Sequence, residues 1–79
     1  MNTIELSDEM EKLQVPPAEY SIGRPKDNAF IIICKNGKWR VYFIEKGQVS
    51  EEACFDDEAE ACDDFLAKIK RFASNLAKF

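Results

Sequence analysis

The residues with the clearest chemical potential are carboxylates gathered between positions 51 and 64, a stretch without any basic residue. They are Glu51, Glu52, Asp56, Asp57, Glu58, Glu60, Asp63 and Asp64. Carboxylates this close together repel one another, and the repulsion is costly in a small domain. Each one alone is typical of a solvated helix start, but the set as a whole favours a surface that binds a basic partner.

Carboxylates can also hold a metal ion or act as an acid and base pair. The segment DDEAEACDD has neither the spacing nor the glycine of a calcium-binding loop, and a glycosidase-type pair needs a cleft between its members. The chain has no histidine, so the usual general base and a frequent zinc ligand are missing. We therefore expect no enzyme activity, no metal and no cofactor.

The three cysteines, Cys34, Cys54 and Cys62, are odd in number and form no C-x-x-C pair. Each lies within an apolar pattern, which indicates small buried side chains in a reducing compartment. A third hypothesis, an enzyme that uses Cys62, would require a thiol with a perturbed pKa.

Charge is unevenly distributed along a chain whose net charge is −4. Positions 24 to 46 carry six basic residues and two acids, whereas every charged residue from 51 to 64 is acidic. A nucleic-acid partner is not expected, because phosphate binding needs a broad basic field. No apolar run approaches the roughly 20 residues of a membrane span. The N-terminal sequence MNTIELSDEMEK has acids where a signal peptide has basic and then apolar residues, so we expect a cytoplasmic protein.

The composition predicts one domain over residues 1–79. The chain is 46% hydrophobic and 33% charged, which is ordinary for a soluble globular protein. A lone core of this size supplies only about 3–5 kcal/mol of net stability. Little of the chain is left over to build a deep catalytic cleft.

The strongest structural signal is a β-hairpin over Phe30 to Ile44, with Asn36-Gly37 at its turn. Both central residues of a type I′ turn need φ > 0, which Asn and Gly tolerate best. The first arm is apolar throughout and predicts a central strand covered on both faces. The second arm alternates: Trp39, Val41 and Phe43 share one face, which we assign to the core, and Tyr42 lies on the other.

Weaker signals extend the prediction on both sides of the hairpin. Ser7 resembles an N-cap, so a short helix is expected between residues 7 and 15, ended by Pro16-Pro17. Short strands are expected over residues 19–22 and 49–55. Asp57 and Glu60 have the form of a capping box that starts a long helix. The apolar stripe of that helix consists of Cys62, Phe65, Leu66, Ile69, Phe72, Ala73 and Leu76.

These elements predict an α+β fold. We expect a small antiparallel meander sheet of three to four strands, with a short N-terminal helix and a long C-terminal amphipathic helix packed on one face. Asp57, Glu60 and Asp64 would lie on the helix face opposite the apolar stripe, with Glu51 and Glu52 nearby.

Four short motifs follow one another over roughly two thirds of the chain: Pro-x-x-Tyr-Ser, Gly-Lys-Trp-x-Val-Tyr, Glu-x-Gly, and Phe followed by Glu-x-Glu-Ala-Cys. The matching positions are Pro17, Tyr20, Ser21, Gly37, Lys38, Trp39, Val41, Tyr42, Glu45, Gly47, Phe55, Glu58, Glu60, Ala61, Cys62 and Phe65. This pattern resembles a set of small bacterial immunity proteins, which neutralise the C-terminal toxin domains of polymorphic and contact-dependent inhibition systems. The resemblance implies an inhibitor of a toxin without naming the toxin.

The charge pattern and the resemblance lead to one hypothesis: an immunity protein whose acidic surface binds a cognate toxin domain, a basic nuclease. The expected binding residues are Glu51, Glu52, Asp56, Asp57, Glu60, Asp63 and Asp64, with Tyr42 and Glu45 as lesser candidates. The alternative is a non-enzymatic adaptor that acts through homo-oligomerisation, such as a homodimer, or through pairing at a sheet edge.

Overall fold

The computed structural model describes the backbone of residues 1–76 and the side chains of residues 1–72. The elements follow the chain in this order: α1 (Thr3–Lys12), the short 3₁₀ turn η1 (Pro17–Glu19), β1 (Tyr20–Ile22), β2 (Ala29–Lys35), β3 (Lys38–Glu45), β4 (Gln48–Phe55) and α2 (Glu58–Leu76). The fold is α+β, as predicted.

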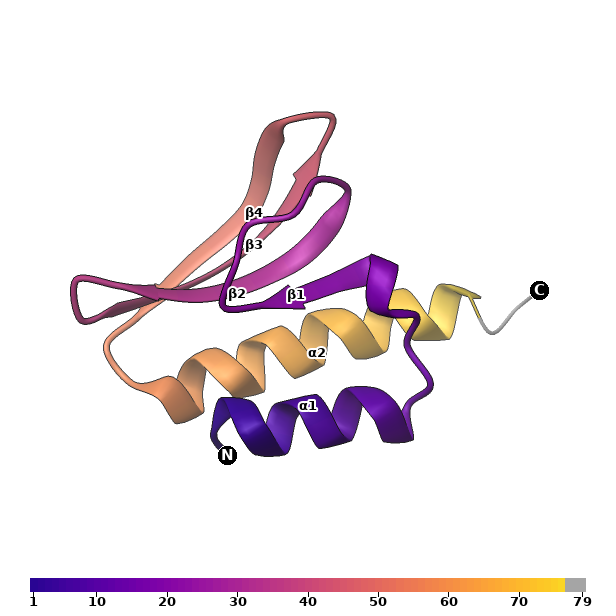
Figure 1. Ribbon diagram of the computed structural model, residues 1–79, viewed down its shortest axis with the longest axis horizontal. Coiled ribbons are helices and arrows are strands. Elements are labelled where there is room, and N and C mark those ends of the chain that lie inside the picture. The colour runs from indigo at the N-terminus through magenta and orange to yellow at the C-terminus, as the bar shows by residue number, and fades with distance from the viewer. Residues whose placement is uncertain (77–79) are drawn as a thin grey trace.

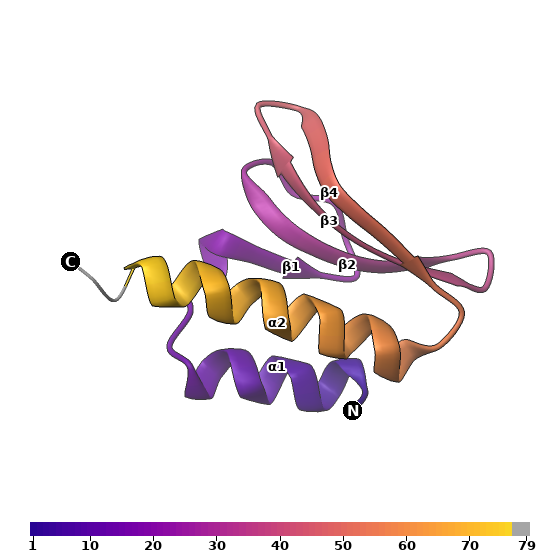
Figure 2. The same cartoon turned by 180° about the vertical axis from the view of Figure 1, so that it is seen from behind.

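The molecule has a sheet and a layer of helices on one of its faces (Figure 1). The four strands lie in the order β1-β2-β3-β4, so β1 and β4 are the edges. Helix α2 packs against β2, β3 and β4, and α1 runs beside α2 on the side away from the sheet (Figure 2). The two helices point in the same direction, with their first turns at the same end of the molecule.

The predicted β2–β3 hairpin is present and sets the register of the sheet. Asn36 and Gly37 have φ values of 54° and 78°, as a type I′ turn requires. The β3–β4 turn repeats this geometry at Lys46 and Gly47, with φ values of 51° and 78°. Strand β2 is central and is buried from both sides, in agreement with its apolar sequence.

Strand β1 differs from the predicted meander because it pairs with β2 in parallel, in the register Tyr20↔Phe30. The connection over residues 23–28 must therefore pass across the sheet before β2 begins. It reaches the β3–β4 turn, where the side-chain oxygens of Asp27 and Asn28 accept hydrogen bonds from the backbone N–H groups of Gly47 (2.9 Å) and Lys46 (3.1 Å). The sheet is mixed, and three of its four strands form the antiparallel part.

The core has two parts, one on each face of the sheet. Between the sheet and α2 lies the main cluster, in which Phe65 and Ile69 of α2 meet Ile32 and Val41 of the sheet. Trp39 and Phe43 pack on its margin, as expected for that face of β3. The second cluster is built on Ala29, Ile31 and Tyr42 and lies on the opposite face.

Helix α1 begins earlier than the sequence suggested. Its N-cap is Asn2, and Asn2 and Glu5 form a complete capping box, with hydrogen bonds of 2.9 and 3.0 Å between each side chain and the other's backbone N–H. Ser7 is therefore inside the helix. The early start allows α1 to bury Leu6 and Met10 fully against α2.

Helix α2 begins where predicted. Oδ1 of Asp57 accepts a hydrogen bond from the backbone N–H of Ala59 (3.2 Å), which places Asp57 at the N-cap. The predicted stripe is confirmed for Cys62, Phe65 and Ile69, which are fully buried. The side chains of Ala73 and Leu76, also assigned to it, lie outside the described residues. Across residues 1–76, neither helix is both long enough and apolar enough to cross a membrane.

Candidate partner-binding surface

The first turns of α1 and α2 meet at one end of the helix layer. Oε2 of Glu58 accepts a hydrogen bond from the backbone N–H of Thr3 (2.9 Å), so the carboxylate of one helix satisfies an unpaired amide of the other. Each N-terminus carries roughly half a positive charge, and two such ends side by side repel each other. Carboxylates at this end offset that repulsion, which is one structural reason why many acids lie near the two helix starts.

Four exposed carboxylates lie within the first two turns of α1 and α2 or at the N-cap of α2, and we call this group the acidic end. It consists of Glu5, Asp57, Glu60 and Asp63. Glu5 and Asp57 accept hydrogen bonds only from backbone amides, and none of the four forms an ion pair with any described side chain. The acidic end therefore keeps its negative charge.

Three other predicted binding residues are instead paired with bases. Glu52 contacts Arg40 across the β3–β4 ladder, and Asp56 contacts Lys38 at the end of the same hairpin. Both pairs are exposed, and the carboxylate of Asp56 raises the pKa of Lys38. Exposed pairs contribute about 0–1 kcal/mol, so a partner's charges can exchange with them. Asp64 pairs with Lys68, with 2.6 Å between Oδ2 and Nζ, and this pair is partly buried.

The pair of Asp64 and Lys68 is structural. Lys68 is only 8% exposed, although it lies on a helix whose outer face is solvated. Its ammonium bonds to Oδ2 of Asp64, one helical turn earlier. A buried ammonium without a partner is costly, so Asp64 is required by the fold and is a poor candidate for partner binding.

Replacing Asp64 with alanine should destabilise the protein, whereas the same change at its neighbour Asp63 should not. Loss of the partner of Lys68 costs about 1–3 kcal/mol, equivalent to at least about 4 °C in Tm for a domain of this size. Asp63 is exposed and unpaired among the described side chains, so Asp63→Ala should melt within about 2 °C of the wild type, which corresponds to a change below 0.5 kcal/mol. Thermal unfolding of both variants by circular dichroism is the measurement. Equal melting temperatures would contradict a structural role for Asp64.

Tyr42 does not occupy the exposed position that the alternation of β3 suggested. It is 5% exposed and belongs to the second core cluster. The guanidinium carbon of Arg40 lies 5.3 Å from the centre of its ring, so a cation also covers it. Tyr42 is a core residue, because it packs with Ala29 and Ile31 of β2 on the face of the sheet opposite the main cluster.

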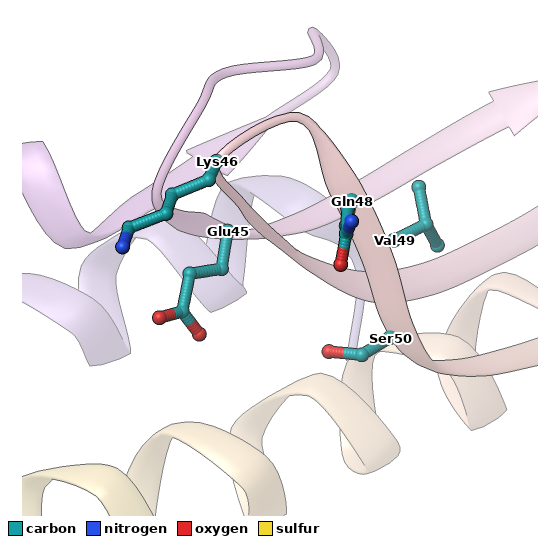
Figure 3. Close-up of a pocket in the computed structure, with 5 residues that line it drawn as sticks. All are labelled: Glu45, Lys46, Gln48, Val49 and Ser50. Carbon is teal, nitrogen blue, oxygen red and sulfur yellow. The ribbon is translucent and has the colours of Figure 1, made fainter.

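Glu45 and Glu51 lie beside two different hollows. Glu45 precedes the β3–β4 turn and lines a hollow of about 360 Å³ together with Lys46, Gln48, Val49 and Ser50 (Figure 3). Glu51 lies in a β-bulge of β4 with a φ of 54°, opposite Tyr42 on β3. Its side chain lines a hollow of about 250 Å³ between β4 and α2, where Lys68 and Arg71 partly offset its charge.

Two of the three cysteines are exposed, contrary to the expectation that all are buried. Cys34 and Cys54 lie on the surface, and only Cys62 is buried. Burial is the main cause that raises the pKa of Cys62 to about 11, and the nearby carboxylate of Glu58 adds to the effect. The buried thiol is therefore protonated and unreactive at neutral pH, which removes the support for catalysis by Cys62.

Thiol alkylation should consequently occur in two phases. In the folded protein at pH 7.5 or so, iodoacetamide should modify Cys34 and Cys54 at similar rates and leave Cys62 unmodified until the chain unfolds. Mass spectrometry of the intact protein would detect two additions, and a third only in denaturant. Early labelling of Cys62 would contradict both its burial and its raised pKa.

The structure adds one acid to the predicted set. Glu5 joins the acidic end because α1 lies parallel to α2, and its capping box, Asn2-x-x-Glu5, is a sequence signal that could have located it. Within residues 1–72, no three His, Cys, Asp or Glu side chains are grouped so as to hold a metal ion. The chemistry available at this surface is charge complementarity.

Comparison of the chain with known protein families, with curated proteins and with solved structures finds no match.

Proposed function

We propose that this protein is an immunity protein that binds and neutralises a cognate toxin domain, a basic nuclease. The observation that carries the proposal is the acidic end, whose four carboxylates Glu5, Asp57, Glu60 and Asp63 are exposed and without a basic partner among the described side chains. The motifs in the sequence support a toxin domain as the partner. The exposed carboxylates support binding through opposite charges.

The mechanism is imitation of phosphate. A nuclease carries a cationic surface that holds the nucleic-acid backbone, so a protein with exposed carboxylates at one end is attracted to that surface and competes for it. Attraction between opposite charges raises the association rate. A fast inhibitor protects the cell from toxin before nucleic acid is cut. The protein acts in the cytoplasm, where the nucleic acid is.

The test is protection in a bacterial host. The resemblance implies a toxin that is the C-terminal domain of a larger protein. The domain to test is that of a large secreted protein encoded immediately upstream, expressed with and without this chain. We expect growth to be restored only when both are present, and the purified chain to inhibit nucleic-acid cleavage at a molar ratio of one to one. The proposal is overturned if the chain neither restores growth nor binds the toxin domain.

The open edge of the sheet favours a second candidate, an adaptor that forms a homodimer through β4. Residues Gln48–Glu52 of this edge strand are all exposed. A homodimer of this kind would have twice the mass of the chain in light scattering, and it would be unaffected by charge reversal at Glu60 and Asp63. A monomer whose protective activity depends on these acids would exclude the adaptor.

A further inference from the structure

We propose that a basic side chain of the toxin domain docks in a hollow between α1 and the end of β1. This inference rests on the proposed function and specifies one contact that holds the toxin domain. The hollow measures about 370 Å³ and is lined by Thr3, Ile4, Ser7, Asp8 and Ile22. Strand β1 ends at the same end of the molecule at which α1 begins, so the hollow lies near the joined helix starts (Figure 1).

Ile4 is an apolar residue at a position where the fold does not need one. Its side chain is 75% exposed, more than any other large apolar side chain that the structure describes. Leu6 and Met10 are the buried residues of α1, and Ile4 lies about 200° around the helix from Leu6, so it points away from α2. Single exposed apolar residues are common on protein surfaces. Ile4 differs because Ile22 of β1 lines the same hollow, which therefore has an apolar residue on each of its two elements.

Asp8 places a negative charge at this hollow. It lies one helical turn after Ile4 on the same face of α1, since residues four apart are neighbours on a helix. Asp8 is exposed, and it forms no ion pair with any described side chain. Lys12, the only base of α1, contacts Glu9 instead, at 3.5 Å. No basic residue is among the five that line the hollow, so the carboxylate is open to a cation from a partner.

An apolar wall beside a carboxylate fits a long basic side chain. The CH₂ stem of an arginine or lysine packs along apolar surface while its charged head reaches a polar partner. Here the stem lies against Ile4 and Ile22, and the head donates a hydrogen bond to the carboxylate of Asp8. A purely apolar side chain would cover Asp8 without giving it a partner, which is costly. An acidic side chain would be repelled.

A second copy of this chain fits the hollow less well than a basic nuclease does. The net charge of the chain is −4, so two copies repel each other as they approach. A nuclease instead carries a basic field, and arginine is among the residues enriched where a few side chains dominate a protein interface. The charge of the hollow therefore selects the toxin domain as its occupant.

The test is a double-mutant cycle on the dissociation rate of the complex with the toxin domain, since short-range contacts act mainly on dissociation. We expect Ile4→Ala and Asp8→Asn each to speed dissociation at least about tenfold, through loss of the apolar contact and of the hydrogen bond to a charged group. Independent contacts would multiply to about a hundredfold, whereas the double variant should stay below about thirtyfold, because both residues hold one side chain.

Matched controls separate this contact from general changes in charge and surface. Glu11→Gln removes the same charge from an exposed position of α1 that does not line the hollow, and Val49→Ala trims another exposed apolar side chain. Both should dissociate like the wild type. Ile4→Leu restores the apolar area and should recover most of the wild-type lifetime. All these variants should melt within about 2 °C of the wild type, because the replaced side chains are exposed.

The outcomes distinguish this contact from the proposed function. If either single variant dissociates like the wild type, or if the two effects multiply fully, docking of one basic side chain in the hollow is overturned and the proposed function stands. If the wild type does not bind the toxin domain, both fall. A wild-type dimer in light scattering that Ile4→Ala and Asp8→Asn dissociate would also overturn the docking and would assign the hollow to a second copy.

Discussion

Replacing Phe65 with alanine should leave the chain without a cooperative thermal transition. Phe65 is fully buried and is among the largest side chains of the main cluster, where α2 meets the sheet. Truncation of a buried phenylalanine costs about 3–5 kcal/mol. A lone core of this size supplies only about 3–5 kcal/mol in total, so the loss matches the whole stability.

Two variants show whether the loss arises from the cavity. Phe65→Leu keeps most of the apolar volume and should unfold cooperatively at a reduced Tm. Val49→Ala changes a side chain that is 51% exposed and should stay within about 0.5 kcal/mol of the wild type. Circular dichroism against temperature is the measurement for all three. A cooperative transition of Phe65→Ala within a few degrees of the wild type would show that α2 does not hold the sheet as described.

Charge reversal at the acidic end should slow binding of the toxin domain by about 10- to 1000-fold at low salt. The variant carries Glu60→Lys and Asp63→Lys, two exposed positions that make no contact required by the fold among the described side chains. Two lysines convert local attraction into repulsion, so encounters fail before any short-range contact forms. Stopped-flow fluorescence under excess toxin domain measures the association rate.

The control for that variant has the same change in total charge at another place. Glu11→Lys with Glu19→Lys alters the later part of α1 and η1, away from the paired helix starts (Figure 1). It should retain most of the wild-type rate, because screening limits the reach of exposed charges to about 10 Å at 0.1 M salt. Equal slowing by both variants would mean that net charge matters and that the acidic end has no special role.

The parts of the fold that the sequence predicts are those specified by neighbouring residues. Asn36 and Gly37 determine their turn through their own φ preferences, and the stripe of α2 follows from spacings of three and four. Asp57 is likewise predictable as an N-cap, because its own side chain bonds to the backbone of the next turn. At the N-terminus two local signals competed, and the complete capping box of Asn2 and Glu5 prevailed over the single side chain of Ser7.

What the sequence missed depends on contacts between distant segments. A three-residue strand carries no signal of direction, so the parallel pairing of β1 could not be foreseen. Tyr42 is buried because residues of β2 pack beside it on the second face of the sheet, and Glu52 is paired because the register of β4 places it beside Arg40. The acidic cluster was visible in the sequence, but its division into paired and unpaired carboxylates required the structure.

The central claim is that unpaired carboxylates at the joined helix starts guide a cationic toxin domain onto this protein. Its most direct test is the association rate constant of the wild type with that domain, followed by stopped flow as ionic strength rises from about 0.01 M to about 1 M and the screening length falls from about 30 Å to about 3 Å. The rate constant should drop from about 10⁸–10⁹ M⁻¹s⁻¹ towards the 10⁵–10⁶ M⁻¹s⁻¹ or so of uncharged encounters. A rate constant that stays the same across this range would contradict the claim, even if the complex forms tightly.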